Sequence, residues 1–268
     1  MNKVIEYRDN NYKVIPIVTK KGKIINVINF RHLKSYLPID VVIMAGGKGT
    51  RLRPLTEKTP KPLLKVGEKP ILEHNITRLA LFGMDDFWIS VNYLGEQIEE
   101  YFGNGSDNNL KINYVWEKEP LGTIGAVSKI KDFEHDTVLV TNSDILTNLN
   151  YEDFYLRFVE ENADFAVMTI PYKVDVPYAV LETDNGHVVS FKEKPSYTYY
   201  SNGGIYLMKR ELVNHIPANS HFNTTDLMEE LIAKGKKVIS YPFSGYWLDV
   251  GKHEDFAKAQ TDIKKLDI

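Results

Sequence analysis

A basic segment that directly follows a glycine-rich loop is the part of this chain best suited to bind phosphate. Residues 48–65 contain six lysines and arginines but one acid, Glu57, so the segment carries +5 in a chain of net charge −3. The loop contains Gly46, Gly47 and Gly49 and follows the apolar run 41–44. Glycines let a backbone approach a ligand closely and expose its N–H groups to phosphate oxygens. Together these features predict a polyphosphate site, although a basic run alone is more often a solvated surface.

Two common nucleotide-binding signatures are excluded at this loop. A Walker A loop requires Gly-Lys-Ser/Thr at a fixed spacing, and that tripeptide is missing. The pattern G-x-G-x-x-G also fails, because Leu52 stands where the glycine after Gly47 and Gly49 should be.

A longer motif around the loop resembles the signature of the sugar-1-phosphate nucleotidyltransferases, also called nucleotide-sugar pyrophosphorylases. Its two parts are Gly46-Gly47-x-Gly49-Thr50-Arg51-Leu52-x-Pro54-Leu55-Thr56 and Pro60-Lys61-Pro62-Leu63-Leu64. The resemblance covers residues 40 to about 260. It implies a Rossmann-like, Mg²⁺-dependent enzyme that joins a nucleoside triphosphate (NTP) to a sugar 1-phosphate and releases pyrophosphate.

The reaction that this resemblance implies needs positive charge more than it needs a general base. A phosphate monoester has a second pKa of about 6, so a sugar 1-phosphate is largely a dianion at neutral pH. The obstacle is to bring several negative groups together. Catalysis should therefore consist of positioning and electrostatic neutralisation.

The resemblance places the nucleotide and the reacting phosphates at the glycine-rich loop and the segment after it. The residues implied to hold the nucleotide are Ala45, Gly46, Gly47, Lys48, Gly49 and Thr50. Arg51 would neutralise the triphosphate during attack, and Lys61 would contact the reacting phosphates, with Arg53 as a weaker candidate. A rigid exposed turn is the alternative for Lys61, which lies between two prolines.

Two aspartates match the metal-binding positions of the family. Asp144 follows the apolar run 137–141, and Asp249 lies within 245–251. Two carboxylates, together with phosphate oxygens and water, suit Mg²⁺. A single aspartate at a strand end is more often a turn former. The family often has glycine where Ser143 stands here, which leaves Asp144 in register.

The segment 117–126 resembles the family's loop that contacts the base. Gly122 would present its backbone to the base, and Glu117 or Glu119 could accept a hydrogen bond from a guanine edge. Capping of a helix by Thr123 is a competing role for this stretch.

A separate motif matches the family's sugar-phosphate site. In the sequence Phe-Lys-Glu-Lys-Pro of residues 191–195, Lys194 would bind the phosphate and Glu193 the sugar hydroxyls. Asn202 and Gly203 would line the sugar pocket, and Glu182 would border it.

Several tyrosines surround this motif. Tyr197, Tyr199 and Tyr200 could close over a substrate or form a subunit contact, and the sequence leaves both interpretations open. Tyr178 could border the sugar pocket, although a tyrosine in a hairpin is more often a packing residue. A homo-oligomer is one option for the assembly of the chain.

The base and the sugar are less closely determined than the family. The segments 60–64 and 119–123 look most like those of guanylyltransferases that act on hexose 1-phosphates, which favours GTP. Residues 1–38, described below, resemble part of a CBS domain. This arrangement of a CBS-like segment ahead of such a domain is similar to that of guanylyltransferases for glucosamine 1-phosphate in bacterial legionaminic acid synthesis. Mannose or heptose 1-phosphate, a uridylyl- or thymidylyltransferase, and a non-catalytic nucleotide-sugar sensor are the alternatives.

The elements that position these residues form an α/β pattern from residue 40 onward. Apolar runs predict strands over 41–44, 87–91, 111–116 and 137–141, and helical spacing predicts helices over 71–82, 95–102 and 123–130. This alternation predicts a Rossmann-like mixed, mainly parallel sheet flanked by helices. The glycine-rich loop then lies at the carboxyl end of the first strand, where ligands bind in open α/β sheets.

The second half of the chain predicts hairpins. Strands are expected over 163–170, 179–182, 188–192, 204–208 and 237–241, with helices over 225–234 and 252–265. Asp-Asn-Gly at 184–186 is a hairpin signal. We expect a hairpin-rich sugar-binding lobe that leans over the parallel half.

Residues 1–38 do not follow this pattern and are predicted as a segment separate from the nucleotidyltransferase domain at 40–268. A hairpin over 14–18 and 24–28 and a short helix over 30–36 resemble the last β-β-α unit of a CBS domain, a module that often binds adenine nucleotides. Half a module cannot bury its own apolar face, so we expect it to pack on the main domain or to have lost its upstream partner. A plain hairpin cap is the alternative.

Composition narrows the protein class. A chain of 268 residues, 43% hydrophobic, is long enough for a sizeable core. The 33 basic and 36 acidic residues exclude a protein that coats nucleic acid. The absence of cysteine excludes disulfides, thiolate metal sites and a cysteine nucleophile. The sequence shows neither a membrane-spanning apolar run nor a signal-peptide pattern, so we expect a cytoplasmic protein without a membrane partner.

Overall fold

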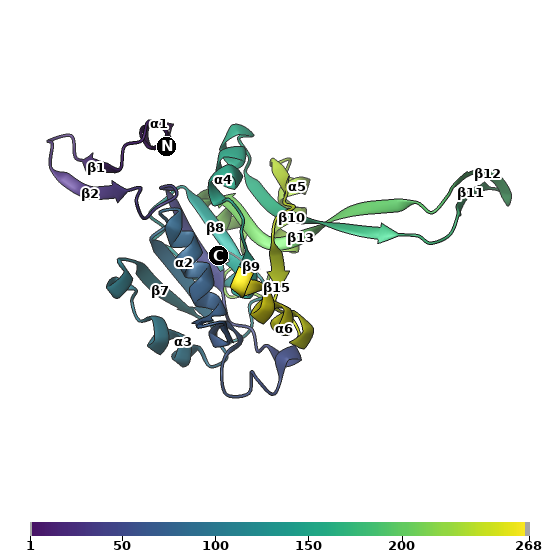
Figure 1. Cartoon of the computed structure of the whole chain (residues 1–268), viewed down its shortest axis with the longest axis horizontal. Coiled ribbons are helices and arrows are strands. Elements are labelled where there is room, and N and C mark those ends of the chain that lie inside the picture. The colour runs from purple at the N-terminus through teal and green to yellow at the C-terminus, as the bar shows by residue number, and fades with distance from the viewer. Residues whose placement is uncertain (1, 266–268) are drawn as a thin grey trace.

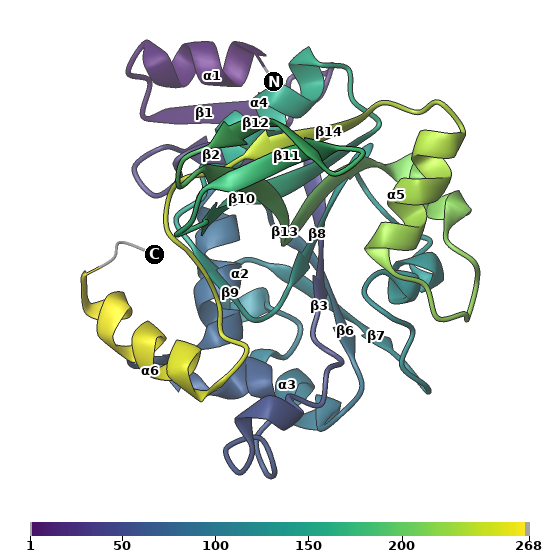
Figure 2. The same cartoon turned by 90° about the vertical axis from the view of Figure 1, so that its right-hand side faces the viewer.

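The computed structural model describes residues 2–265 and contains a seven-stranded sheet with helices on both faces (Figures 1 and 2). The strand order is β14-β10-β13-β8-β3-β6-β7. The bounds are β3 (Ile39–Met44), β6 (Asp86–Val91), β7 (Lys111–Trp116), β8 (Thr137–Asn142), β10 (Phe165–Asp175), β13 (Ser196–Lys209) and β14 (Val238–Pro242). β13 runs antiparallel to β8 and β10, and the other neighbours are parallel. The predicted mixed, mainly parallel sheet is confirmed.

Two apolar layers hold the helices on the sheet. Alternate residues of β3 point to opposite faces, so Val41 and Ile43 join one core while Val42 joins the other. The first core contains buried residues of α2 (Ile71–Leu81), α3 (Gly95–Phe102) and α4 (Tyr151–Glu160). The second contains residues of α5 (Thr224–Ala233) and of the 3-10 helices η4 (Gly125–Lys129) and η5 (Arg210–His215). The helix predicted over 123–130 is thus a short 3-10 helix.

A third, smaller core lies beside the sheet. It joins buried residues of the 3-10 helix η1 (Thr50–Leu52), the ribbon of β4 (Lys65–Val66) and β5 (Lys69–Pro70), β9 (Ile145–Thr147), β15 (Trp247–Asp249) and α6 (His253–Asp262). The 3-10 helices η2 (Lys61–Leu63), η3 (Ser106–Asn108) and η6 (Ile263–Lys265) complete the chain from β3 onward. The closing helix is therefore shorter than predicted.

The hairpin region extends away from the sheet instead of leaning over it. β10 and β13 continue beyond the sheet as a two-stranded ribbon, which ends in the hairpin of β11 (Val180–Asp184) and β12 (His187–Lys192) (Figure 1). We call residues 171–200 the arm. The expectation of a lobe that covers the parallel half is wrong, because the pairing between β10 and β13 carries the ribbon straight outward.

The N-terminal segment forms α1 (Asn2–Asp9) and an antiparallel hairpin of β1 (Val14–Val18) and β2 (Ile24–Asn29). The hairpin matches the prediction, but the helix expected over 30–36 is wrong, because these residues form turns and irregular chain. Arg8 contacts the main body through a 2.6 Å ion pair with Glu152 of α4. Whether this segment corresponds to part of a CBS domain stays a prediction. Among the described residues, no helix is both long and apolar enough to cross a bilayer.

Candidate active site

The predicted phosphate-binding residues meet at the carboxyl end of β3 and β8. A cavity of about 380 Å³ there is lined by the glycine-rich loop, Arg51, Lys61 and Asp144. This is the edge of a parallel sheet at which ligands bind. The structure therefore brings together residues from four separate predicted motifs, including Glu117 and Gly122 of the base loop.

Strand pairing places the two predicted metal ligands side by side. β9 begins one residue after Asp144, and its antiparallel pairing with β15 sets Asp249 opposite Ile145. The backbone N–H of Val250 donates to the carbonyl oxygen of Asp144 at 2.9 Å. Leu248 packs in the third core, which fixes β15 against β9. Two carboxylates from distant parts of the chain thus face one site.

Lys61 lies between these carboxylates. Its Nζ donates to Oδ2 of Asp144 and lies 3.9 Å from Oδ1 of Asp249. The lysine is 8% exposed, so the alternative of an exposed turn is wrong for this residue. Because Pro62 is buried with it in η2, the flanking prolines hold a buried cation at the phosphate site.

The remaining carboxylate oxygens fit a hard cation. Oδ1 of Asp144 and Oδ1 of Asp249 are buried and have no hydrogen-bond partner among residues 2–265. Burial, reinforced by the charge of Asp144, raises the pKa of Asp249, while Lys61 and Arg51 oppose the shift. Carboxylate oxygens without a hydrogen-bond partner are ligands that suit Mg²⁺. These two residues would hold the metal.

A second acidic cluster lies at the opposite end of the sheet. Ligand atoms of Asp40, Asp86 and His135 lie within 4.8 Å of one another. The Asp40 carboxylate accepts the backbone N–H groups of Glu134 and His135, and Asp86 pairs with Lys111 at 2.9 Å. These contacts give the cluster a structural role in closing the loop before β8.

The glycine-rich loop leaves backbone donors free for an anion. The N–H groups of residues 46–49 donate no hydrogen bond within the described part of the chain, whereas Ala45 N donates to Ser90 O. Unpaired backbone donors next to a cavity are suited to phosphate oxygens. Gly49 has φ +60°, and a Cβ added there would lie 3.0 Å from Cβ of Lys61 and 3.0 Å from Cγ2 of Thr56.

The glycines of this loop should differ in their response to alanine. Gly49→Ala is expected to lower the free energy of unfolding by about 1–2 kcal/mol, because alanine is strained at positive φ. Gly47→Ala places its methyl group in open space and should leave thermal stability unchanged. Gly47 lines the cavity, so a methyl group at this position should lower NTP affinity by about tenfold or 1.4 kcal/mol. Thermal melts and NTP titrations measure both; equal melting losses in the two variants would contradict this assignment.

Asp249→Asn is expected to stabilise the metal-free protein. A carboxyl whose pKa is raised by folding binds protons more tightly in the folded state, so its contribution to stability falls as pH rises through that pKa. At pH 7 the variant should melt at a higher temperature than the wild type, and this gain should shrink toward the ordinary pKa of 3.8. Thermal melts of both proteins across a pH series, with a metal chelator present, measure this difference in melting temperature. Mg²⁺ should then stabilise only the wild type, because a ligand stabilises the state that binds it.

Glu117 is occupied by protein contacts. Its Oε1 accepts the hydroxyl of Ser90, and its Oε2 accepts the N–H of Leu121 at 2.9 Å. A Cβ on Gly46 would lie 2.9 Å from Oε1. This buried carboxylate therefore ties the base loop to the strands beneath the glycine-rich loop. Gly122, with φ +80°, packs against the carbonyl of Phe222 and lines the cavity.

The predicted sugar-phosphate residues separate into two groups. Asn202 and Gly203 line a cavity of about 330 Å³ that also contains Asp249 and shares Thr123 and Asn142 with the first cavity. Glu182, Glu193 and Lys194 are instead exposed on the arm, outside both cavities. The structure does not bring these three residues to the body of their own chain.

Three residues of the site were missed by sequence reasoning. Asn142 ends β8 and lines both cavities. Its position two residues before Asp144 could have identified it as a site residue. Trp247 donates its Nε1–H to the carbonyl of Gly203 at 2.9 Å, and it precedes Asp249 by two positions. His221 lines the first cavity, and the sequence offers no local signal for that position.

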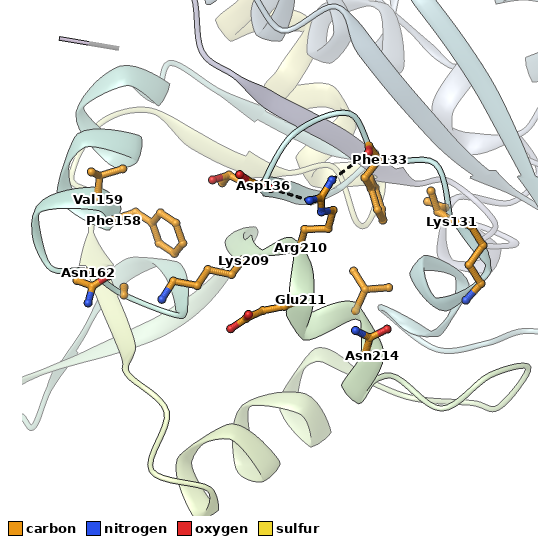
Figure 3. A pocket seen from close by; sticks show the side chains of 14 residues that line it. Lys131, Phe133, Asp136, Phe158, Val159, Asn162, Lys209, Arg210, Glu211 and Asn214 are labelled. Atoms are coloured by element: carbon orange, nitrogen blue, oxygen red, sulfur yellow. Dashed lines mark hydrogen bonds and ion pairs between the residues drawn. The ribbon is translucent and has the colours of Figure 1, made fainter.

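A larger cavity of about 670 Å³ lies at the other end of the sheet, where β8 begins and β13 ends (Figure 3). Its three cationic side chains are all bonded to protein groups: Lys209 pairs with Asp164 at 2.8 Å, Arg210 pairs with Asp136 at 2.7 Å, and Lys131 donates to the carbonyl of Ser128 at 2.9 Å. None of the predicted site residues lines it. Size alone therefore does not identify the active site of this chain.

Comparisons with known proteins agree with this placement. A model of the nucleotidyl transferase family matches residues 40–265. Mannose-1-phosphate guanylyltransferase of Mycobacterium tuberculosis is 32% identical over 231 residues, which cover 84% of this chain and 64% of that protein. UTP–glucose-1-phosphate uridylyltransferase of Synechocystis sp. is 31% identical over 247 residues, 85% of this chain and 64% of that protein.

Two further relatives are matched over nearly their whole length. D-glycero-α-D-manno-heptose 1-phosphate guanylyltransferase of Aneurinibacillus thermoaerophilus is 30% identical over 229 residues, 84% of this chain and 99% of that protein. The crystal structure of HddC from Yersinia pseudotuberculosis with GMP-PN has a TM-score of 0.64 and 28% identity, covering 84% of this chain and 99% of that chain. By contrast, this chain spans just under two thirds of the first two relatives.

Proposed function

This chain belongs to the nucleotidyl transferase family, and we propose that it transfers a nucleotidyl group from an NTP to a sugar 1-phosphate with release of pyrophosphate. The observation that carries the proposal is the first cavity, in which free backbone donors, Arg51, Lys61 and the Asp144 carboxylate meet, with Asp249 in the lining of the adjoining second cavity. Such a set of groups neutralises and aligns phosphates, which is what this reaction requires.

Each group has a distinct task in the proposed mechanism. The backbone of residues 45–50 holds the nucleotide, and Arg51 and Lys61 neutralise charge on the triphosphate. A sugar-phosphate oxygen attacks the α-phosphorus in line, and the bond from that phosphorus to the pyrophosphate oxygen breaks as the new bond forms. No proton has to be removed from the dianionic nucleophile. Asp144 and Asp249 would hold Mg²⁺, which would supply additional positive charge near the phosphate oxygens.

We further propose GTP as the nucleotide and a hexose 1-phosphate, such as glucosamine 1-phosphate, as the acceptor. Two of the relatives described above are guanylyltransferases, for mannose 1-phosphate and for a heptose 1-phosphate. The uridylyltransferase relative makes UTP with a hexose 1-phosphate the second candidate. Gly122 would present backbone groups to the base, while Glu117 would orient the loop without binding guanine directly.

The proposal is tested in two steps. Thermal melts with GTP, UTP, CTP, ATP or dTTP, each with Mg²⁺, should show the largest stabilisation with the preferred nucleotide. Pyrophosphate release is then measured with that nucleotide and a panel of sugar 1-phosphates. Stabilisation by a nucleotide without pyrophosphate release for any sugar would support a non-catalytic sensor and contradict the enzyme.

A further inference from the structure

The arm is an amphipathic ribbon whose apolar face lies in water. In the register of β10 and β13, Tyr172 lies opposite Tyr199 and Val174 opposite Tyr197, and both pairs point to one face. At the tip, Leu181 lies opposite Phe191, which is 66% exposed. The neighbouring face of the tip is polar, since Glu182 pairs with Lys192 at 3.4 Å and accepts the hydroxyl of Ser190.

A ribbon of this kind requires a partner. An isolated two-stranded hairpin is marginally stable in water, and contiguous exposed apolar surface marks an interaction site. Every residue of β12 is exposed, and the arm makes no second layer in Figures 1 and 2. The partner that covers the ribbon must therefore lie outside this copy of the chain.

The body has a cavity without a cation, and the arm has a lysine without a partner among the described residues. The cavity that contains Asn202 and Gly203 has no lysine or arginine in its lining, although the proposed substrate is a dianion. Lys194 and Glu193 on the arm make no side-chain hydrogen bond or ion pair within the described residues. Lys194 also has φ +42°, an uncommon and costly conformation for a residue other than glycine.

The strand pairing directs the arm away from the body, so that Lys194 lies outside the sugar-phosphate cavity of its own copy. The strands pair without interruption from Thr169–Asn202 to Asp175–Ser196. At the base, a Cβ on Gly203 would lie 2.7 Å from Met168, and the carbonyl of Gly203 accepts the Trp247 indole N–H. Folding the arm onto its own body would break this pairing and packing.

We propose that the arm reaches a second copy of this chain and places Glu193 and Lys194 in that copy's sugar-phosphate cavity. A twofold arrangement lets two arms complete two cavities at once and covers both apolar faces. The inference rests on the proposed function, because it assigns the arm's cation to the sugar phosphate. The active unit is then a homodimer with composite sites.

Mixing two inactive variants tests the composite site directly. Arg51→Ala disables the body and Lys194→Ala disables the arm, so each protein alone should lose most of its turnover. After denaturation and joint refolding, random pairing makes half of the dimers mixed, and each mixed dimer has one intact site. The mixture should therefore regain about a quarter of wild-type activity. A mixture of Arg51→Ala and Asp144→Ala, both body variants, is the matched control and should stay inactive.

The mass of the protein in solution tests the interface independently of activity. Sedimentation should give twice the chain mass of 30.8 kDa for the wild type, and the monomer mass for Leu181→Ser with Phe191→Ser. Val159→Ser, at a 52% exposed apolar residue of α4, should remain dimeric. An active wild type that is monomeric, or whose variant mixture stays inactive, overturns the composite site but not the enzyme. The proposed function is overturned instead if the wild type is a dimer, the arm variant is a monomer, and the wild type shows no turnover with any NTP.

Discussion

Replacing Asp144 by asparagine is expected to lower kcat by about 10³-fold. A catalytic metal contributes several kcal/mol of charge stabilisation, and about 4 kcal/mol corresponds to 10³ in rate. Asp144 has one buried oxygen without a partner and another bonded to Lys61, so asparagine removes the charge that would attract the metal. Pyrophosphate release is measured across Mg²⁺ concentrations, and high Mg²⁺ should restore little of the loss.

The control for this experiment is Asp136→Asn. Asp136 pairs with Arg210 at the far end of the sheet, and its side chain is 93% exposed. This variant removes the same charge from the chain and should keep wild-type turnover. An Asp144→Asn enzyme that retains a tenth or more of wild-type kcat would remove Asp144 from the proposed metal site.

Replacing Lys61 by alanine is expected to lower kcat/KM by about 10²–10³-fold, the range for loss of one preorganised group that stabilises developing charge. Lys61 is buried and reaches both Asp144 and Asp249, so it is held in place before substrate binds. The same change should destabilise the metal-free protein, because two neighbouring carboxylates lose their shared cation. Turnover assays and melts in a chelator measure the two effects.

Lys65→Ala is the matched control for Lys61. Lys65 is exposed in β4, and its side chain makes no hydrogen bond or ion pair within the described residues. Its loss should leave both turnover and melting temperature near the wild-type values. If Lys61→Ala lowered only the melting temperature and left kcat/KM intact, the lysine would have a structural role alone.

The phosphate-binding half of the site was predictable because its information is local. The loop at 46–49 directly follows β3, and Arg51 and Asp144 also lie within a few residues of strand ends. In a parallel sheet the carboxyl ends of strands share one edge, so order along the chain already implies proximity in space. The burial of Lys61 was not predictable in the same way, since it depends on η2 packing beside the third core.

Residues joined by long-range pairing were harder to predict. Glu117 was expected to face a base, yet both its oxygens bind protein groups, one of them on Ser90 of a neighbouring strand. The position of Asp249 beside Asp144 depends on the pairing of β15 with β9. Helical spacing over 30–36 suggested a helix, but the chain there forms turns, because short segments take their conformation from tertiary contacts.

The sequence by itself determined the class of the chemistry, because the glycine-rich loop, the basic segment and the alternation of strands and helices are each patterns of contiguous residues. It also predicted the hairpin around the turn at 184–186, but not the ribbon that residues 171–175 and 196–200 form below it. Only the tertiary structure decided where that ribbon lies. Its direction follows from the pairing of β10 with β13 and from the packing of Gly203 against Met168, which are contacts between distant segments. Such contacts cannot be predicted from a local sequence pattern. They are the reason that Lys194 lies away from the cavity of its own chain.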